Sequence, residues 1–252
     1  MNSIAVSLIV FACVFGGALF GMLLRAVLPE HHLNSDSKDI VKLGMGLVGT
    51  MAALVLSLLV ASAKGSYDVQ GSELTQGSAN VVLLDGILAQ YGPEETKEAR
   101  DQLRVVVTRV LDRMWSKDRA SSAPSDPSSA GGAAFFEKIQ GLAPKDDRQH
   151  LLQAQALNLA IGLGQTRWLM YEQGTTSVSV PLLVVLVLWL TLILGSFGLF
   201  APANGTVITS LCLSALSVAA AIFLILEMYS PYSGVIQVSS APLRAALAHL
   251  GQ

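Results

Sequence analysis

Four long apolar runs, each closed by charged or turn-forming residues, set the pattern of this chain. The second is the most clearly bounded, because no residue between Lys42 and Lys64 is charged. A helix of this length measures about 30 Å, which matches the hydrocarbon core of a bilayer. The last two runs form one charge-free stretch that Pro202-Ala203-Asn204-Gly205 interrupts. The pattern predicts membrane spans over about 4–25, 42–64, 179–200 and 206–228.

The second run has a face of small and weakly polar residues, spaced three and four apart as on one side of a helix. Its members are Gly46, Thr50, Ala53, Ser57, Ala61 and Lys64. In an oligomer this face could line a pore, where hydroxyls and exposed backbone replace part of an ion's hydration shell. Alternatively it packs against another helix, as small residues do in membranes. The sequence leaves both interpretations open.

Apolar residues continue beyond the second run at a seven-residue spacing, at Tyr67, Leu74, Val81 and Leu88. This period predicts that the helix extends out of the membrane. Gly92-Pro93 then predicts the start of another helix, which reaches about Trp115. Its arginines and acidic residues alternate, which favours a solvated face held by pairs within the helix.

The rest of the region predicts a helical extramembrane domain over 64–178, between hairpins at 1–63 and 179–228. Ser, Pro, Gly and Ala dominate 116–133, which indicates a disordered linker. A short helix is expected over 135–142, and a long one from Pro144 to about Gln173. In the tail, 229–252, Pro242 can begin a short amphipathic helix that lies on the membrane or docks on the domain. The expected fold class is all-α.

Small residues within the other spans predict close contacts between helices, because lipid provides no hydrophobic drive for helix association. The candidates are Gly17 and Gly21 in the first span, Gly195 and Gly198 in the third, and Ser210, Ser214 and Ser217 in the fourth. Glu227 ends the fourth span. We favour an interfacial position for it over a polar site that faces the bundle.

Composition agrees with a membrane protein, since 13% of the residues are charged against about 25% in soluble domains. A net charge of −2 gives no basis for nucleic-acid binding. Cys13 and Cys212 have no partners at metal-ligand spacing, and no phosphate loop, nucleophile elbow or His-Glu-x-x-His motif occurs. We therefore expect no catalytic residue, no cofactor and no metal, and the protein is not expected to be an enzyme.

The loop that joins the first two spans contains possible metal ligands, namely Glu30, His31, His32, Asp36 and Asp39. Adjacent histidines cannot easily share one ion, and no separated ligand pattern supports them. Asp36 or Ser37 instead fits the N-cap of the second span, with Asp39 in the first turn. We favour this capping interpretation over a metal site.

Four segments resemble the bestrophin-like family of bacterial membrane proteins. They are LPEHHLNSDSKDIVKLGMGL, ASAKGSYDVQGSELTQGSANVVLLD, QTRWLMYEQ and FLILEMYSPYSGVIQVSSAPLRAALAHLGQ, and the last is the most specific. The resemblance implies kinship with bestrophins, which are pentameric anion channels with four spans and cytoplasmic termini. It implies a homo-oligomer in the bilayer, a multi-pass protein of the bacterial inner membrane, and inorganic anions as possible partners.

Two departures from bestrophins stand out. Bestrophins narrow their pore with large apolar and aromatic residues four apart on the second span, whereas Val48, Ala52, Leu56 and Val60 include no aromatic. No acidic cluster matches their calcium clasp. The leading hypothesis is an anion channel whose second span lines the pore. The alternative is a non-conducting scaffold or sensor whose helical domain binds a partner.

Charge near the spans does not determine orientation. One side of the membrane would receive Lys64, Arg167 and Arg244, and the other Arg25, Lys38 and Lys42. These counts are equal, so the positive-inside rule favours neither side. The resemblance alone favours a cytoplasmic domain and cytoplasmic termini.

Overall fold

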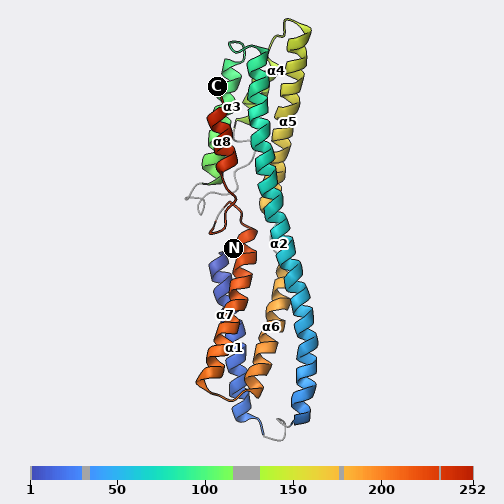
Figure 1. Cartoon of the computed structure of the whole chain (residues 1–252), viewed down its shortest axis with the longest axis vertical. Coiled ribbons are helices and arrows are strands. Elements are labelled where there is room, and N and C mark those ends of the chain that lie inside the picture. The colour runs from blue at the N-terminus through green and yellow to red at the C-terminus, as the bar shows by residue number, and fades with distance from the viewer. Residues whose placement is uncertain (1, 30–34, 116–130, 176–178, 233, 252) are drawn as a thin grey trace. The chain divides into compact units, whose positions relative to one another are not determined.

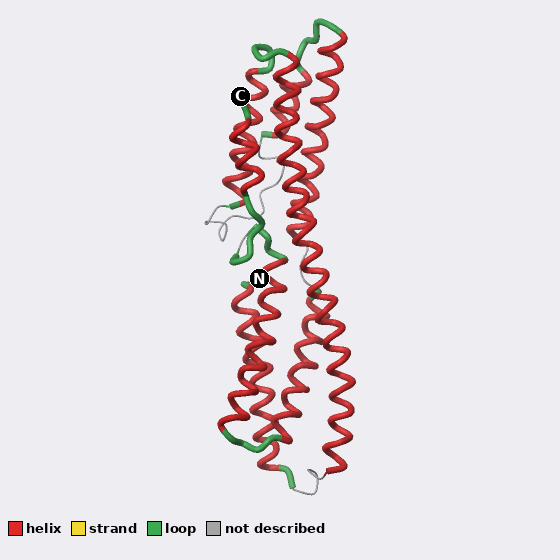
Figure 2. The backbone as a smooth tube through the Cα atoms, in the orientation of Figure 1, coloured by secondary structure: helices red, strands yellow, loops and turns green. Residues whose placement is uncertain are grey.

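The structure is a computed structural model that describes residues 2–29, 35–115, 131–175, 179–232 and 234–251. All regular secondary structure in these ranges is helical, as Figure 2 shows. The helices are α1 (Ser3–Val27), α2 (Ser35–Tyr91), α3 (Lys97–Met114), α4 (Gly132–Gln140), α5 (Asp147–Thr175), α6 (Val180–Phe200), α7 (Gly205–Met228) and α8 (Ala241–His249). The expected all-α fold class is confirmed for the described part of the chain.

The chain forms two compact units. Unit 1 comprises Met1–Gly65 and Ser177–Tyr229, and unit 2 comprises Ser66–Thr176 and Ser230–Gln252. Helix α2 contributes its first part to unit 1 and its second part to unit 2, without a break (Figure 1). The prediction that this helix continues past Lys64 is therefore confirmed.

Unit 1 contains α1, α6, α7 and the first part of α2. By length and composition, α1, α6 and α7 could each cross a membrane, and so could α2. An α2 of 57 residues would extend about 85 Å, which is far more than one bilayer core can hold. The charge-free part between Lys42 and Lys64 is the part that fits.

Glycines bring α1 and α6 into close contact, as the small-residue pattern predicted. A Cβ atom added at Gly21 would overlap the carbonyl oxygen of Gly195, and one at Gly198 would overlap that of Ala18. At Gly17 it would lie 2.5 Å from Cγ2 of Thr191. Backbone therefore meets backbone at this crossing, and the packing prediction for both glycine pairs is confirmed.

The serines of α7 do not pack in this way. Ser210, Ser214 and Ser217 are exposed, so the packing prediction is wrong within one chain. The hydroxyls of Ser214 and Ser217 donate hydrogen bonds to the carbonyl oxygens of Ser210 and Leu213, four residues earlier. The α7 surface around them is an open hollow, which Thr206 and Thr209 also line.

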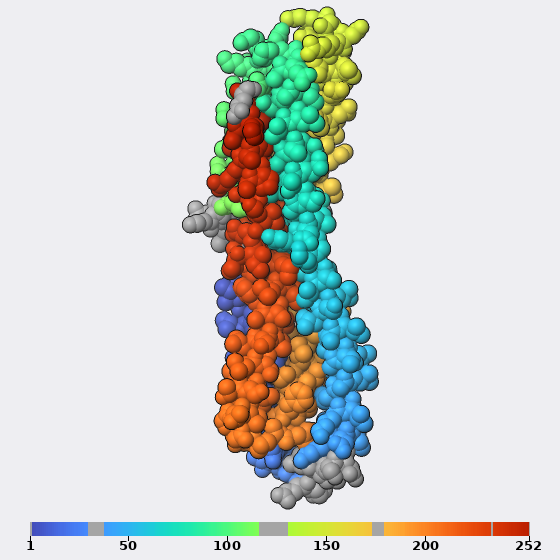
Figure 3. Space-filling model, in the orientation of Figure 1, coloured from blue at the N-terminus to red at the C-terminus, as the bar shows by residue number. Residues whose placement is uncertain are grey.

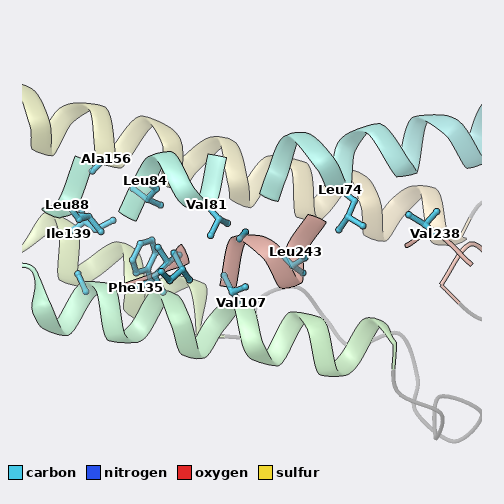
Figure 4. Close-up of a cluster of buried hydrophobic side chains, with 14 of the residues drawn as sticks. Leu74, Val81, Leu84, Leu88, Val107, Phe135, Ile139, Ala156, Val238 and Leu243 are labelled. Atoms are coloured by element: carbon cyan, nitrogen blue, oxygen red, sulfur yellow. The ribbon is translucent and has the colours of Figure 1, made fainter. Parts of the chain in front are cut away.

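Unit 2 packs the second part of α2 with α3, α4, α5 and α8 around one apolar core. Leu74, Val81 and Leu88 are buried in it, which confirms the seven-residue spacing. Phe135 and Ile139 come from α4, and Figure 4 shows them beside the α2 side chains. The tail docks on this unit, because Leu243, Ala246 and Leu250 lie in the same core.

Side chains hold the non-helical part of the tail as well. The indole N–H of Trp115 donates to the carbonyl oxygen of Val238 at 3.0 Å, and the hydroxyl of Tyr67 donates to that of Gln237 at 3.1 Å. Both bonds attach the segment before α8 to helices of unit 2. Of the two alternatives for the tail, docking on the helical domain is the one observed.

Three predicted boundaries are wrong. Helix α3 begins at Lys97 rather than at Pro93. The buried Thr96 hydroxyl is shared between the carbonyl oxygens of Leu88, at 2.7 Å, and Gly92, at 2.8 Å. This bonding closes a turn before the helix begins. Helix α5 begins at Asp147, three residues after Pro144. Gly132 and Ala133 belong to α4 instead of the linker. The rest of the linker, 116–130, lies outside the described residues.

Candidate functional site: the exposed face of α2

The six residues proposed for the pore share one exposed face of α2. Gly46, Thr50, Ala53, Ser57, Ala61 and Lys64 are all exposed in the chain. A Cβ atom added at Gly46 would meet nothing within 4 Å. Figure 3 shows this part of α2 in light blue, with one of its sides uncovered in the view. The helices of the same chain therefore do not cover this face.

A different face of α2 makes the contacts within unit 1. Ala52, Leu59 and Ala63 are buried in the core of that unit, and a Cβ atom added at Gly49 would touch Cδ1 of Ile193 at 4.0 Å. Small residues on a helix usually allow close packing. Here the six residues are exposed and the buried face of α2 is a different one, so this face is open to another protein, lipid or water.

The chemistry of this face is weakly polar. The Thr50 hydroxyl donates to the carbonyl oxygen of Leu47 at 2.7 Å, which satisfies its proton and leaves its oxygen able to accept or coordinate. Large exposed side chains, including Leu47, Leu54 and Leu58, flank the face on one side. A helix with small polar residues on one face and large apolar residues beside them is suited to contact water on the first face and an apolar environment on the second.

The four positions compared with the bestrophin pore do not share this face. Ala52 is buried, Val48 and Leu56 are half-buried, and Val60 is 40% exposed. Three of the four therefore lie largely against the chain's own helices. The four positions therefore do not form a second exposed face of α2.

A charged cluster in unit 2 was missed by sequence reasoning. The Asp85 carboxylate is buried and receives two hydrogen bonds of 2.8 Å from the Arg100 guanidinium, one to each oxygen. The backbone N–H of Gly251 donates to the same carboxylate at 3.1 Å. Arg100 was expected on a solvated face paired within its own helix, and this expectation is wrong. One signal was available, since Asp85 is the only charged residue between Glu73 and Glu94.

The surroundings of Asp85 determine its protonation. Burial by itself would raise the pKa of this carboxyl, but three groups act in the opposite direction. Hydrogen bonds from Arg100 and Gly251, with the positive charges of Arg100 and Arg104, hold the pKa below its ordinary value of 3.8. The carboxylate is therefore charged at neutral pH and ties the end of the chain to α2 and α3.

Two other sequence hypotheses meet different outcomes. Glu227 lies in the last turn of α7, near the helix end, as an interfacial position requires. The residue is nevertheless only 5% exposed, and this burial was not predicted. His31 and His32 lie outside the described residues. Helix α2 begins at Ser35, so Asp36 and Ser37 lie inside the helix, and the prediction that one of them is its N-cap is wrong. Within the ranges that the structure describes, no group of three His, Cys, Asp or Glu side chains could hold a metal ion.

Comparison with known proteins identifies the family. A profile of the bestrophin-like domain matches residues 12–243, which is nearly the whole chain. This chain belongs to the bestrophin-like family. Together with the four apolar helices, this membership makes it a membrane protein. No protein of curated function matches the sequence.

Two solved structures of a bacterial bestrophin homologue from Klebsiella pneumoniae, each a different point mutant, have the same fold as this bestrophin-like protein. One mutant superposes with a TM-score of 0.59 at 14% identity, over 96% of this chain and 97% of that chain. The other mutant gives a TM-score of 0.54 at 13% identity, over 94% of this chain and 97% of that chain. At such low identity the likeness concerns the fold alone.

Proposed function

We propose that this protein is an oligomeric ion channel of the bacterial inner membrane whose pore is lined by α2. Membership of the bestrophin-like family supports a channel over an enzyme. The observation that carries the pore assignment is the exposure of all six residues of the α2 face, from Gly46 to Lys64. In a ring of subunits this face would surround a common axis and meet water.

Anions are the proposed permeant ions. Each subunit would contribute one Lys64 side chain, which is exposed at the end of the charge-free run. A ring of ammonium groups raises the local concentration of anions. Thr50 and Ser57 would offer hydroxyl groups, and Gly46 open backbone, to ions passing along the axis. A pentamer is the subunit number that the bestrophin likeness favours.

We expect Thr50→Leu and Ser57→Leu to leave the oligomer intact and to lower halide flux at least about tenfold, because each adds bulk to the wall of a narrow pore. Lys64→Glu should shift the reversal potential towards cation selectivity, because it replaces a ring of positive charges by a negative one. The measurement is flux and reversal potential in proteoliposomes made from the purified oligomer.

Leu54→Phe is the matched control for bulk, since Leu54 is 73% exposed but flanks the six-residue face. It should conduct like the wild type. If Thr50→Leu dissociates the oligomer while the wild type conducts no ion at any voltage, pH or calcium concentration, the face packs helices instead. The alternative of a scaffold or sensor, whose helical domain binds a partner, would then stand.

We further propose that the helical domain over 64–178 and both termini lie in the cytoplasm, as the family likeness favours. Alkaline phosphatase fused at Ser122 should be inactive, because that enzyme requires the oxidising periplasm to form its disulfides. The control is a fusion after Ala203, in the exposed turn between α6 and α7, which should be active. The reverse pattern of activities would place the domain in the periplasm.

A further inference from the structure

Helix α5 runs antiparallel to the second part of α2 within unit 2. The Gln149 amide, in the first turn of α5, donates to the carbonyl oxygen of Tyr91, the last residue of α2, at 3.0 Å. Further along α5, Ala156 lies in the same core as Leu84 of α2, and Figure 4 shows these two side chains beside each other. Both helices rise about 1.5 Å per residue, so equal steps from Gln149 and back from Tyr91 lead to neighbouring positions.

This register places the last turns of α5 close to the membrane-spanning part of α2. Trp168 falls near Ser72, and Tyr171 lies three residues closer to the membrane. The charge-free run of α2 ends at Lys64, and the next charged residue is Asp68. Measured from these two residues, Trp168 lies about 6–12 Å beyond the hydrocarbon core and Tyr171 about 2–8 Å beyond it. The headgroup layer of a bilayer is about 5–8 Å thick on each side, so both rings lie in it or at its edge.

Trp168 stands out among the aromatic residues of unit 2. Its side chain is 53% exposed and that of Leu169 is 55% exposed. The indole meets the ring of Tyr171 edge to face, with the ring centroids 5.9 Å apart. In the part of unit 2 that the structure describes, no other Trp, Tyr or Phe is exposed. An indole has an apolar body and a polar N–H group, a combination that favours the border between membrane and water.

The connection of the chain brings this end of α5 to the bilayer independently of the register. Helix α5 ends at Thr175, and the span α6 begins at Val180. The residues between them can cover at most about 17 Å. Within unit 1, the Tyr229 hydroxyl shares a hydrogen bond of 3.0 Å with the Ser62 hydroxyl, so another aromatic lies where the charge-free run of α2 ends. Aromatic residues gathered at one border of the spans are typical of a membrane interface.

The polar neighbours of Trp168 identify which layer of the membrane suits it. Gln165 and Glu172 are exposed on the same turns of α5. Acyl chains would offer the amide and the carboxylate no hydrogen-bond partners, whereas headgroups and their water offer many. Leu169, in contrast, gains nothing from bulk water. A layer that accepts both kinds of side chain is therefore the best occupant.

We propose that the end of α5 binds the headgroup layer of the bilayer through Trp168, Leu169 and Tyr171. The ligand is a phospholipid, bound at its headgroup and glycerol backbone. This contact holds the helical unit at a fixed depth beside the span of α2. The inference goes beyond the proposed function, because it applies to a channel and to a scaffold alike.

The test measures which lipids quench the fluorescence of Trp168. The protein contains three tryptophans, so Trp115→Phe with Trp189→Phe leaves Trp168 as the single indole. The full-length variant is reconstituted into phosphatidylcholine liposomes whose acyl chains carry bromine, a short-range quencher, either next to the headgroup or near the chain end. We expect bromine next to the headgroup to quench Trp168 more strongly than bromine near the chain end, because the indole lies in the headgroup layer.

Ile161→Trp provides the matched control, in a chain whose three native tryptophans are replaced by phenylalanine. Ile161 lies two turns earlier on the same side of α5, is 46% exposed, and is about 10 Å further from the membrane. Bromine next to the headgroup should quench this indole at least about twofold less than Trp168. Trp189, near the middle of α6, is the reference for the membrane interior and should respond most to bromine near the chain end. Each variant should keep the helical circular-dichroism spectrum of the wild type.

Three results would overturn the inference. Equal quenching at positions 161 and 168 would mean that no border of the membrane lies between them. Quenching of Trp189 without quenching of Trp168 would mean that lipid does not contact the end of α5. Acrylamide, a quencher dissolved in water, would then quench Trp168 if water surrounds it and spare it if another protein covers it. Stronger quenching of Trp168 by bromine near the chain end would place it in the hydrocarbon core. Ion flux is not involved in any of these results, so the proposed function would stand in each case.

Discussion

Gly21→Ala is expected to prevent stable packing of α1 on α6. The added Cβ atom would overlap the Gly195 carbonyl oxygen and lie 2.9 Å from its carbon and 3.0 Å from the backbone nitrogen of Leu199. Backbone atoms cannot rotate away as a side chain can, so the two helices must separate. Overpacking costs about 1–3 kcal/mol in ordinary cores, and we expect the upper end here. The measurement is the thermal unfolding of the purified full-length protein in detergent.

Gly16→Ala provides the control for this change. It makes the same substitution in the same helix, but the added Cβ atom would meet nothing within 4 Å. We expect a melting temperature equal to or above that of the wild type, because alanine favours a helix by about 1 kcal/mol over glycine. Equal melting temperatures for the two variants would contradict the close crossing of α1 and α6.

Asp85→Asn is expected to destabilise unit 2 by about 3–5 kcal/mol, the usual cost of removing one partner from a buried ion pair. The Arg100 side chain, 15% exposed, would lose its counterion, and the Gly251 N–H would lose a charged acceptor. Denaturant unfolding of the full-length protein at pH 7 measures this loss. Glu98→Gln is the control, since it removes a carboxylate whose side chain is 85% exposed, and it should change stability little.

The same pair predicts a dependence on pH. The pKa of Asp85 is lower in the folded protein than in the unfolded chain, so folding favours the charged carboxylate. Its contribution is fully present above the ordinary value of 3.8 and is lost as the pH falls through the lower, folded value. The stability difference between wild type and Asp85→Asn should therefore stay constant near neutrality and shrink below about pH 4. A constant difference down to pH 2 would show that another group governs acid unfolding.

The apolar runs predicted the helices of unit 1 well, because length, charge and glycine spacing are properties of single segments. The bounds of α6 and α7 lie within one residue of the predicted 179–200 and 206–228 at every end. Glycine spacing also marked the residues of α1 and of α6 at which these helices approach another backbone closely, but it did not indicate that the two helices would meet each other. A close-packing residue can be predicted without knowledge of which helix it will meet.

Features that join distant segments could not be predicted in the same way. Thr96 reaches back to Leu88, and Asp85 binds Gly251 at a separation of 166 residues, so nothing local in the sequence specifies either bond. The α2 face is an intermediate case. Its spacing was visible in the sequence, but its exposure depends on which other face of α2 the remaining helices cover.

The division of unit 2 into two stretches of chain has a consequence for its biosynthesis. Ser66–Thr176 leaves the ribosome before α6 and α7, whereas Ser230–Gln252 leaves after them. Until that last stretch is made, the Trp115 indole has no Val238 carbonyl and the Asp85 carboxylate no Gly251 amide to bind. Domains usually fold as units in the order of their synthesis. Here the helical unit must wait for the final hairpin to be translated, so its completion is among the last steps in the maturation of the chain.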